Sequence, residues 1–206
     1  MAIIETGVGA PGHDHVLKCM FEARKRVFVD LLKWNVPVLD ERFEIDEFDD
    51  PDATYIILAD PPGDHLGSAR LLQTTRPHIL GGLFPQLCAG PVPAGPEVLE
   101  ITRFCLDRSL GASERLKVRN RLVSALVAHA LQRGIRAYTG VAEIGWLQQI
   151  LAFGWDCRPL GAPRHIGGRV LGALAIAIGP DTPALLDRNG IWADEDAAAT
   201  ALSQAA

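Results

Sequence analysis

The sequence predicts a single-domain α/β/α sandwich, in which helices cover both faces of a mixed central sheet. Its 206 residues match the usual length of one domain. Two strand-like runs around a short Pro/Gly turn indicate an antiparallel hairpin in the first half. In the second half, the order strand, helix, strand, helix, strand indicates a sheet with helices on both sides. Together these observations place the chain in the α/β class.

The composition argues against several classes of protein. Hydrophobic residues make up 48% of the chain and charged residues 22%, as in ordinary globular domains. The formal net charge of −5 is opposite in sign to that of most nucleic-acid-binding domains, so we expect no nucleic-acid partner. The longest nearly apolar run, Val170 to Gly179, is about half as long as a membrane-spanning helix, so we expect no membrane contact. The first residues do not read as a secretory signal, and we therefore expect a cytoplasmic protein.

The cysteines and histidines do not follow a metal-binding or redox motif. No two cysteines have the CxxC spacing, and the six histidines are scattered along the chain. We therefore expect unpaired thiols and no metal site. The cysteines are Cys19, Cys88, Cys105 and Cys157.

The first half of the chain is predicted to contain one helix, an acidic loop and the hairpin. The helix is predicted over 14–33, because five residues recur in steps of four and three and would share one face. These residues are Leu17, Phe21, Arg24, Phe28 and Leu31. The acidic loop follows over 40–52, and the hairpin pairs strand 55–59 with strand 66–74 across the turn 61–64.

The second half is predicted to alternate strands with helices. In order it contains strand 98–106, helix 115–133, strand 138–142, helix 144–153 and a fully buried strand 170–178. The Ala-rich residues 194–206 offer few large apolar anchors. We therefore expect a domain over 1–193, followed by a mobile tail.

Four charged residues interrupt these apolar patterns. Arg24 lies on the predicted buried face of the helix, and Arg70 lies inside an apolar strand. Glu100 and Arg103 lie three residues apart in one strand, so strict alternation would send them to opposite faces. A β-bulge near 101–102 would bring both to one face. Because a buried charge is costly unless it is paired, we expect these residues to have partners.

The acidic loop offers such partners. It holds eight carboxylates against one arginine, and Ile45, Phe48 and Tyr55 provide apolar anchors for folding it onto the body. Taken alone, such a loop reads as a solvated turn. Folded inward, it would complete a balanced set that is either a structural ion-pair network or part of a functional pocket. The set pairs Arg24, Arg70 and Arg103 with Asp46, Asp49 and Glu100.

In their order and spacing these residues resemble the acyl-homoserine-lactone synthases, the LuxI-type autoinducer synthases of bacterial quorum sensing. The resemblance covers roughly the first 105 residues, and past them it rests on a strand–helix–strand pattern that leads to Gly154-Trp155. It implies the GNAT acetyltransferase fold, with an acyl-pantetheine site in a V between two central strands. The matching positions are Arg24-x3-Phe28-x5-Trp34, Asp46-Glu-Phe-Asp49, Arg70 within Ser-Ala-Arg-Leu-Leu, and Glu100-x2-Arg103-Phe104.

The resemblance implies an acyltransferase with two substrates and no cofactor. Family members join an acyl chain, carried on acyl-carrier protein or on coenzyme A, to the amine of S-adenosylmethionine. The product then closes to an N-acyl-homoserine lactone, and methylthioadenosine leaves. Aromatic faces and carboxylates suit the sulfonium of this substrate, and an arginine suits its carboxylate. The residues expected at S-adenosylmethionine are Arg24, Phe28, Trp34, Asp46, Asp49, Arg103 and Phe104.

The expected catalytic set contains Glu100, Arg103, Arg70, Asp46 and Asp49. An α-amine has an ordinary pKa near 7.7–8.0, so part of it is already neutral at pH 7 and a mild base suffices. Glu100, directly or through water, is expected to be that base. Arg70 is expected to lock the acidic loop by pairing with Asp46, which leaves open whether the two are catalytic or structural.

Two further surfaces are expected. An acyl pocket behind the V would use Thr139, Val141, Trp146 and Leu147, with Thr139 at the position that the family associates with 3-oxo chains. An acidic carrier protein would need a cationic docking patch on this acidic chain. The start of helix 115–133 is the candidate, although a merely solvated helix face would look the same. Its basic residues are Arg115, Lys117, Arg119 and Arg121.

Two other functions stay open. A GNAT-type N-acyltransferase would use acyl-CoA on another small amine, and Arg108-Ser-Leu-Gly111-Ala-Ser113 partly resembles the pyrophosphate-binding motif of such enzymes. A non-catalytic sensor would bind S-adenosylmethionine or an acyl chain without turnover. Release of methylthioadenosine distinguishes a synthase from both.

Overall fold

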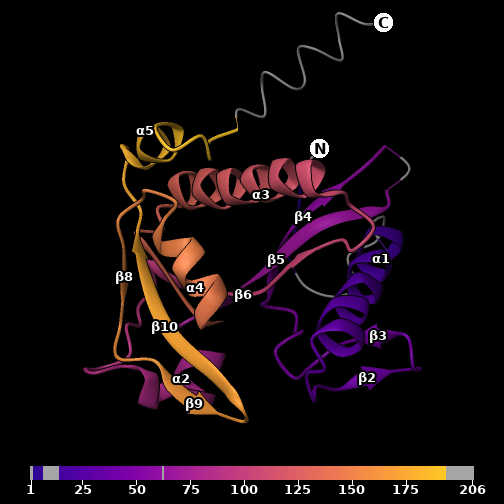
Figure 1. The fold of residues 1–206 in the computed structure, drawn as a ribbon, viewed down its shortest axis with the longest axis horizontal. Coiled ribbons are helices and arrows are strands. Elements are labelled where there is room, and N and C mark those ends of the chain that lie inside the picture. The colour runs from indigo at the N-terminus through magenta and orange to yellow at the C-terminus, as the bar shows by residue number, and fades with distance from the viewer. Residues whose placement is uncertain (1, 7–13, 62, 194–206) are drawn as a thin grey trace, which may run out of the picture.

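A mixed sheet forms the centre of the molecule, as predicted (Figure 1). The structure is a computed structural model that describes residues 2–6, 14–61 and 63–193. Within them the strand order is β1, β4, β5, β6, β7, β10, β8, with β9 paired to β10. The β6–β7 pair is parallel and the other pairs are antiparallel. The strands are β1 (Ala2–Thr6), β4 (Thr54–Ala59), β5 (His65–Gln73), β6 (Val98–Leu106), β7 (Ala137–Glu143), β8 (Cys157–Pro159), β9 (Arg164–Ile166) and β10 (Arg169–Ala177).

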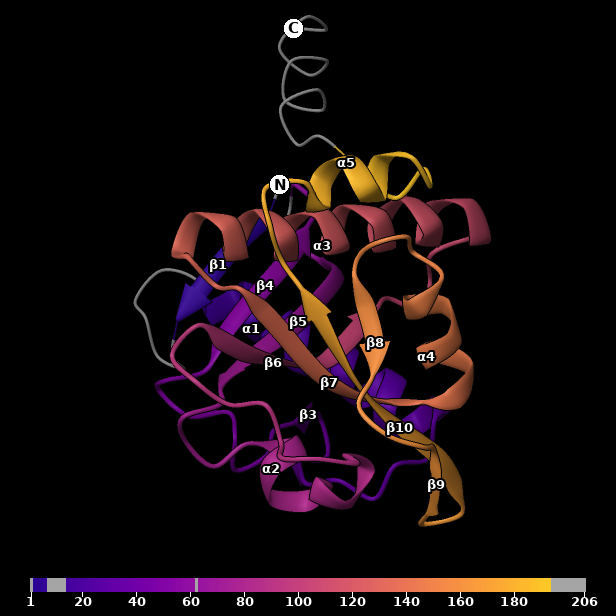
Figure 2. The same ribbon diagram turned by 90° about the vertical axis from the view of Figure 1, so that its left-hand side faces the viewer.

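Helices cover both faces of this sheet (Figures 1 and 2). One face carries α1, its continuation as the π-helix η1, and α2. The other face carries α3 and α4, and α5 packs on the outside of α3. A separate small hairpin of β2 and β3 contacts α1. The bounds are α1 (Asp14–Arg24), η1 (Lys25–Leu31), β2 (Val38–Leu39), β3 (Phe43–Glu44), α2 (Ile79–Leu83), the 3-10 helix η2 (Pro85–Leu87), α3 (Ala112–Arg133), α4 (Ile144–Leu151) and α5 (Thr182–Asp187).

Two apolar layers join the helices to the sheet, because successive residues of a strand point to opposite faces. In β4, Ile56 and Leu58 belong to the core under α3, whereas Tyr55 and Ile57 pack with residues of α1. Both faces of this strand are buried, which explains its unbroken apolar run. The predicted α/β/α sandwich is therefore confirmed.

The parallel pair β6–β7 is short and opens towards one end. Its ladder joins Val98–Glu100 to Ala137–Thr139. Past these residues β6 continues along β5, and β7 continues along β10. The two strands therefore diverge after Glu100 and Thr139, which gives the V that the family resemblance implied.

A β-bulge in β6 lies at Arg103, slightly later than the predicted position at 101–102. Residues 102–105 of β6 face residues 68–70 of β5, so β6 has one extra residue. Arg103 has a φ of +49°, in the left-handed region that bulges often use. The extra residue brings the side chain of Arg103 to the face that carries Glu100, as predicted.

The helix predicted over 14–33 ends at Leu31 and changes type on the way. After Arg24 it continues as a π-helix, whose wider turn shifts the angular position of the residues that follow. Arg24 and Phe28 are buried as predicted, but Leu31 is 47% exposed. The prediction for Leu31 was wrong because it assumed the α-helical period throughout.

Several short elements were not expected. α2, β8, β9 and α5 contain only three to six residues each, too few for periodicity to indicate them. The last long strand, β10, was predicted to be fully buried. Only its middle is, since its first three residues are half-buried and its last residue is exposed.

None of the helices in the described part of the chain is long and apolar enough to cross a bilayer. The tail predicted at 194–206 lies outside the described residues.

Candidate active site

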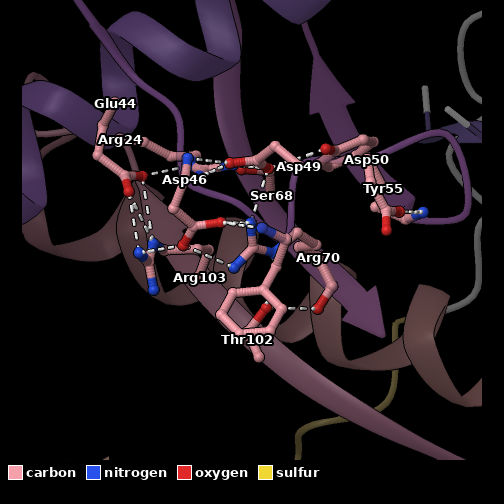
Figure 3. Close-up of polar contacts among 12 residues, drawn as sticks. Arg24, Glu44, Asp46, Asp49, Asp50, Tyr55, Ser68, Arg70, Thr102 and Arg103 are labelled. Atoms are coloured by element: carbon pink, nitrogen blue, oxygen red, sulfur yellow. Dashed lines mark hydrogen bonds and ion pairs between the residues drawn. The ribbon is translucent and has the colours of Figure 1, made fainter. Parts of the chain in front are cut away.

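Three arginines and three carboxylates form a buried ion-pair network (Figure 3). They come from the end of α1, from β3 and the loop after it, from β5 and from the bulge of β6. The three negative charges balance the three positive ones, a condition for burying charges without an unpaired group. The members are Arg24, Glu44, Asp46, Asp49, Arg70 and Arg103.

Arg24 holds two carboxylates at once. Its Nε donates to Glu44 at 2.6 Å, and its Nη1 and Nη2 donate to the two oxygens of Asp49 at 2.7 and 2.9 Å. The planar fork of a guanidinium matches a carboxylate in this way. Arg24 therefore fixes the acidic loop to the end of α1.

Arg70 and Arg103 share the carboxylate of Asp46. Arg70 donates from Nη1 and Nη2 to Asp46 at 2.5 and 3.0 Å, and from Nε to the hydroxyl of Thr102 at 3.0 Å. Arg103 donates from Nη2 to Asp46 at 2.6 Å and to Glu44 at 2.9 Å. The structure thus contains the predicted Arg70–Asp46 pair.

The carboxylates also organise the acidic loop itself. The hydroxyl of Tyr55 donates to Asp49 at 2.8 Å, and the backbone N–H of Asp46 donates to the same carboxylate at 2.8 Å. The backbone N–H of Phe48 donates to Asp46 at 2.9 Å. The loop is therefore folded onto the body and is not the solvated turn that it resembles in isolation.

These charges shift the pKa values of their neighbours. Burial alone would raise the pKa of Asp49, but the hydrogen bond and charge of Arg24, together with the charge of Arg70, hold it below its usual range. Burial would lower the pKa of Arg24, but Asp49 and Glu44 raise it above its ordinary value. Arg24 and Asp49 are therefore both charged at neutral pH.

Glu44 occupies the place in the network that was predicted for Glu100. Glu44 is fully buried and contacts both Arg24 and Arg103. The sequence contains eight acids in this loop, and their types do not distinguish one from another. One signal was available, because Glu44 lies between Phe43 and Ile45, and both apolar neighbours pack against the core beside α1.

Glu100 lies apart from the network, where β6 and β7 diverge. Its side chain is fully buried, and its Oε1 accepts a hydrogen bond from the N–H of Leu80 at 2.9 Å. Among the described residues, neither its Oε2 nor the hydroxyl of the adjacent Thr139 has a hydrogen-bond partner. Burial raises the pKa of Glu100 to about 7, against the opposing effects of the Leu80 and Ile79 N–H groups and of Arg70. At neutral pH this carboxyl is therefore partly protonated, unlike an ordinary glutamate.

Phe28 and Trp34 form an aromatic wall beside Arg103. Their ring centroids lie 4.7 Å apart at an interplanar angle of 25°. The guanidinium carbon of Arg103 lies 5.6 Å from the centroid of Phe28 and 5.8 Å from that of Trp34. Lys33, with a φ of +56°, turns the chain so that the backbone N–H of Trp34 donates to the carbonyl of Phe28 at 2.8 Å. An aromatic wall next to a guanidinium can receive a ligand that carries both a cation and a carboxylate.

Three predicted site residues lie on the opposite face of the sheet. Phe104 packs on Trp146 at a centroid distance of 5.3 Å, and both belong with Leu147 to the core under α3 and α4. Thr139, the register partner of Glu100, and Val141 face α2 instead. The reason is the alternation of strand residues, which separates Phe104 from the aromatic wall. The four residues predicted for the acyl pocket do not line one cavity.

The basic residues at the start of α3 do not form one patch. Residues two apart on a helix point about 200° apart, so Arg115 and Arg119 lie on a different side from Lys117 and Arg121. Arg115 donates to backbone carbonyls of the loop before α3, and Arg119 lies 4.9 Å from the ring centroid of Phe153. Lys117 is exposed and Arg121 is half-buried. Only Lys117 and Arg121 therefore remain as candidates for a docking patch on this helix.

One group of described residues could hold a metal ion. Ligand atoms of His15, Cys19 and Asp64 lie within 4.8 Å of one another. The group lies at the start of α1 and the turn between β4 and β5, whereas Arg24 ends α1. The expectation of no metal therefore stays a prediction.

Comparison with known proteins identifies the family. The model of the autoinducer synthase family matches residues 12–179. An acyl-homoserine-lactone synthase of Ralstonia nicotianae is 38% identical over 169 residues, which cover 79% of this chain and 82% of that protein.

Solved structures agree with this result. BjaI, described as a CoA-dependent acyl-homoserine lactone synthase and solved with SAM and isopentyl-CoA, is 28% identical with a TM-score of 0.80, over 92% of this chain and 89% of BjaI. BjaI has also been solved with MTA. A putative N-acetyltransferase from Lactobacillus plantarum, 17% identical with a TM-score of 0.57 over 87% of this chain and 98% of its own, supports the GNAT-like fold alone. The resemblance read from Arg24, Phe28, Trp34 and the charged residues is confirmed: this chain belongs to the autoinducer synthase family, the acyl-homoserine-lactone synthases.

Proposed function

We propose that this chain joins a thioester-bound acyl chain to the amine of S-adenosylmethionine and closes the product to an N-acyl-homoserine lactone, with release of methylthioadenosine. The observation that carries the mechanism is the position of Glu100. This buried carboxyl has a pKa of about 7 and lies at the divergence of β6 and β7, on the same face as Arg103 and the aromatic wall. Its Oε2 has no hydrogen-bond partner in the part of the chain that the structure describes. The SAM and isopentyl-CoA reported with BjaI support this choice of substrates.

In this proposal the aromatic wall and Arg103 bind S-adenosylmethionine. The sulfonium lies against Phe28 and Trp34, whose ring faces attract a cation. The substrate carboxylate binds Arg103, whose contacts with the network use Nε and Nη2. Its Nη1 points away from those carboxylates (Figure 3), and in this proposal it binds the carboxylate of the substrate.

Glu100 then acts as the general base. Its free oxygen takes a proton from the substrate ammonium, whose ordinary pKa lies within about a unit of that of Glu100, so the transfer is nearly balanced. The neutral amine attacks the thioester carbonyl, a C–N bond forms, and the thiol of the carrier or of coenzyme A leaves. In the second step the substrate carboxylate attacks its own γ-carbon, and the carbon–sulfur bond breaks to release methylthioadenosine. Because this step is intramolecular, correct orientation supplies much of its rate.

The rest of the network positions these groups. Arg24 and Asp49 have at most 1% of their side chains exposed, which favours a structural role over the substrate contact that was predicted for them. Asp46 and Glu44 hold Arg103, and Arg70 holds Asp46. We therefore assign Arg24, Asp46, Asp49 and Arg70 to the support of Arg103.

The acyl donor binds, in this proposal, in the V between β6 and β7. Acyl-CoA and acyl-carrier protein carry the same pantetheine thioester, so this site accepts either group. Docking of the donor outside the V then decides which donor is preferred.

We also propose a cytoplasmic location. All four cysteines are free thiols, as expected in a reducing compartment.

The test is an assay of the purified protein with S-adenosylmethionine and a panel of acyl-CoA and carrier-bound donors. We expect the lactone-ring fragment by mass spectrometry, with one methylthioadenosine released per lactone. Arg103→Ala should abolish the product, while Arg136→Ala, at an exposed pair with Glu97, should not. Consumption of acyl-CoA without methylthioadenosine would indicate the alternative N-acyltransferase, and binding without turnover would indicate a sensor.

A further inference from the structure

Two residues from the far half of the sheet hold the indole of Trp34. We propose that Glu143 and Arg169 are positioning residues of the S-adenosylmethionine site, and that Glu143 also neutralises Arg169 so that a cationic substrate can bind. The inference rests on the proposed function, because that proposal places the sulfonium beside Trp34. Glu143 ends β7 and Arg169 begins β10, and neither belongs to the motifs that carry the family resemblance.

The contacts converge on one carboxylate oxygen. The indole N–H of Trp34 donates to Oε1 of Glu143 at 3.3 Å, and Nη1 of Arg169 donates to the same oxygen at 2.6 Å. Nη2 of Arg169 donates to the backbone carbonyl of Leu32. The guanidinium carbon of Arg169 also lies 5.6 Å from the centroid of the Trp34 ring. The hydrogen bonds that link Glu143 and Arg169 to the segment 32–34 join residues that are 109 and 137 positions apart in the chain.

Trp34 needs these contacts because the segment around it packs weakly on the core. The backbone at Lys33 adopts the left-handed conformation, which is unfavourable for a residue with a side chain. Four large apolar residues near Trp34 are 36% to 54% exposed, so they anchor the segment little. They are Leu31, Leu32, Val38 and Leu39. Stacking on Phe28 fixes the position of one face of the indole. Glu143 binds the indole N–H, and Arg169 ties the carbonyl of Leu32 to the start of β10.

The charges of Glu143 and Arg169 give this ion pair a second role. Trp34 lies near two guanidinium groups, Arg103 at 5.8 Å and Arg169 at 5.6 Å from its ring centroid. Asp46 and Glu44 balance Arg103 within the network. Glu143 balances Arg169, which would otherwise repel a sulfonium that approaches the same ring.

The two roles can be separated without unfolding the protein. The side chain of Arg169 is 28% exposed and that of Glu143 is 41% exposed, so their ion pair contributes little to folding stability. Glu143→Gln keeps an acceptor for the indole N–H but removes the negative charge. Glu143→Leu removes both. Arg136→Leu, which breaks a more exposed Arg–Glu pair at the opposite end of β7, is the matched control.

The experiment compares S-adenosylmethionine with S-adenosylhomocysteine, which has a neutral thioether in place of the sulfonium. Affinities come from calorimetry, and KM values for both substrates come from the lactone assay. We expect Glu143→Leu to weaken both ligands by roughly three- to tenfold, as the loss of an oriented aromatic contact would do. Glu143→Gln should weaken S-adenosylmethionine alone. The KM for the acyl donor and the melting temperature should stay unchanged in both variants, and Arg136→Leu should behave as the wild type.

A Trp34→Phe background tests whether the effect passes through the indole. Phenylalanine keeps a ring but has no N–H, so Glu143→Gln and Glu143→Leu should then have equal effects on S-adenosylhomocysteine. Unchanged affinities in Glu143→Leu would overturn the positioning role, and equal effects of Glu143→Gln on the two ligands would overturn the charge role. If the wild type bound neither ligand, the proposed function itself would fail together with this inference.

Discussion

Glu100 is the general base of the proposed function, because it is fully buried and its Oε2 has no hydrogen-bond partner among the described residues. Glu100→Gln keeps the size of the side chain but cannot accept a proton. We expect the acylation step to slow by about 10²- to 10⁴-fold, the usual contribution of a general base. The affinity for S-adenosylmethionine should change little, since Glu100 lies outside the ion-pair network. Single-turnover kinetics and calorimetry measure the two effects, and an unchanged rate would remove Glu100 from the mechanism.

The raised pKa of Glu100 also predicts two opposite dependences on pH. The acylation rate of the wild type should rise as pH rises through about 7, because only the ionised carboxylate accepts a proton. The free energy of unfolding should fall as pH rises from 4.5 to 7, because there the folded state keeps a proton that the unfolded state has lost. This group contributes about 3 kcal/mol over that interval. In Glu100→Gln both dependences should be weaker, as measured by rate profiles and urea denaturation. A variant with the wild-type slopes would assign them to another group.

Glu44 offers a test of the network at the same scale. Glu44→Gln leaves Arg24 and Arg103 with one negative charge fewer in a buried site. Removal of one partner from a buried ion pair usually costs about 3 kcal/mol or more. Glu97→Gln, in the exposed pair with Arg136, should change the free energy of unfolding by less than about 1 kcal/mol. Equal effects in urea denaturation would mean that the network does not depend on its charge balance.

At the scale of elements, regular patterns were readable from the sequence and local irregularities were not. The hairpin of β4 and β5 followed from its apolar runs and its turn, and the buried arginines stood out because they interrupt such runs. The π-helix after Arg24 and the bulge at Arg103 depend on tertiary contacts, so the hydrophobic period of the sequence does not predict them. The choice of Glu44 over Glu100 as the third carboxylate depends on the path of the acidic loop. That path is decided by the way in which Phe43 and Ile45 pack on the body.

Substitution of two helix glycines tests how the stability of the protein depends on local backbone conformation. Gly134 ends α3 with a φ of +69°, and Gly145 lies in the first turn of α4. An added Cβ would meet nothing within 4 Å at either position, so packing does not complicate the comparison. Gly134→Ala should destabilise the protein by about 1 kcal/mol, because alanine resists the left-handed region. Gly145→Ala should stabilise it by about 0.5 kcal/mol through the unfolded state. Thermal denaturation measures both, and the same sign in both variants would contradict the argument.

At the scale of the whole molecule, charge separates the two classes of acyl donor. The buried network is neutral, so the net charge of −5 lies entirely outside it. Such a surface repels an acidic carrier protein except where cations gather, whereas acyl-CoA would reach the proposed site in the V as a small molecule. If the V is common to both donors, as proposed, we expect donor preference to depend on the surface.

Lys117 and Arg121, one turn apart on α3, are the two cations that remain of the predicted docking patch, and Lys117 forms an exposed, long ion pair with Glu114 at 3.9 Å. Lys117→Glu combined with Arg121→Glu should lower kcat/KM with carrier-bound donors by about tenfold at low salt, and added salt should reduce the difference. Turnover of acyl-CoA should be unchanged, because α3 covers the face of the sheet opposite to Glu100. Arg133→Glu, on the same helix and roughly 18 Å from Arg121, changes the net charge without changing the patch. If it lowered carrier-linked turnover equally, the loss would reflect the overall charge, and docking would have to be sought on another face of the molecule.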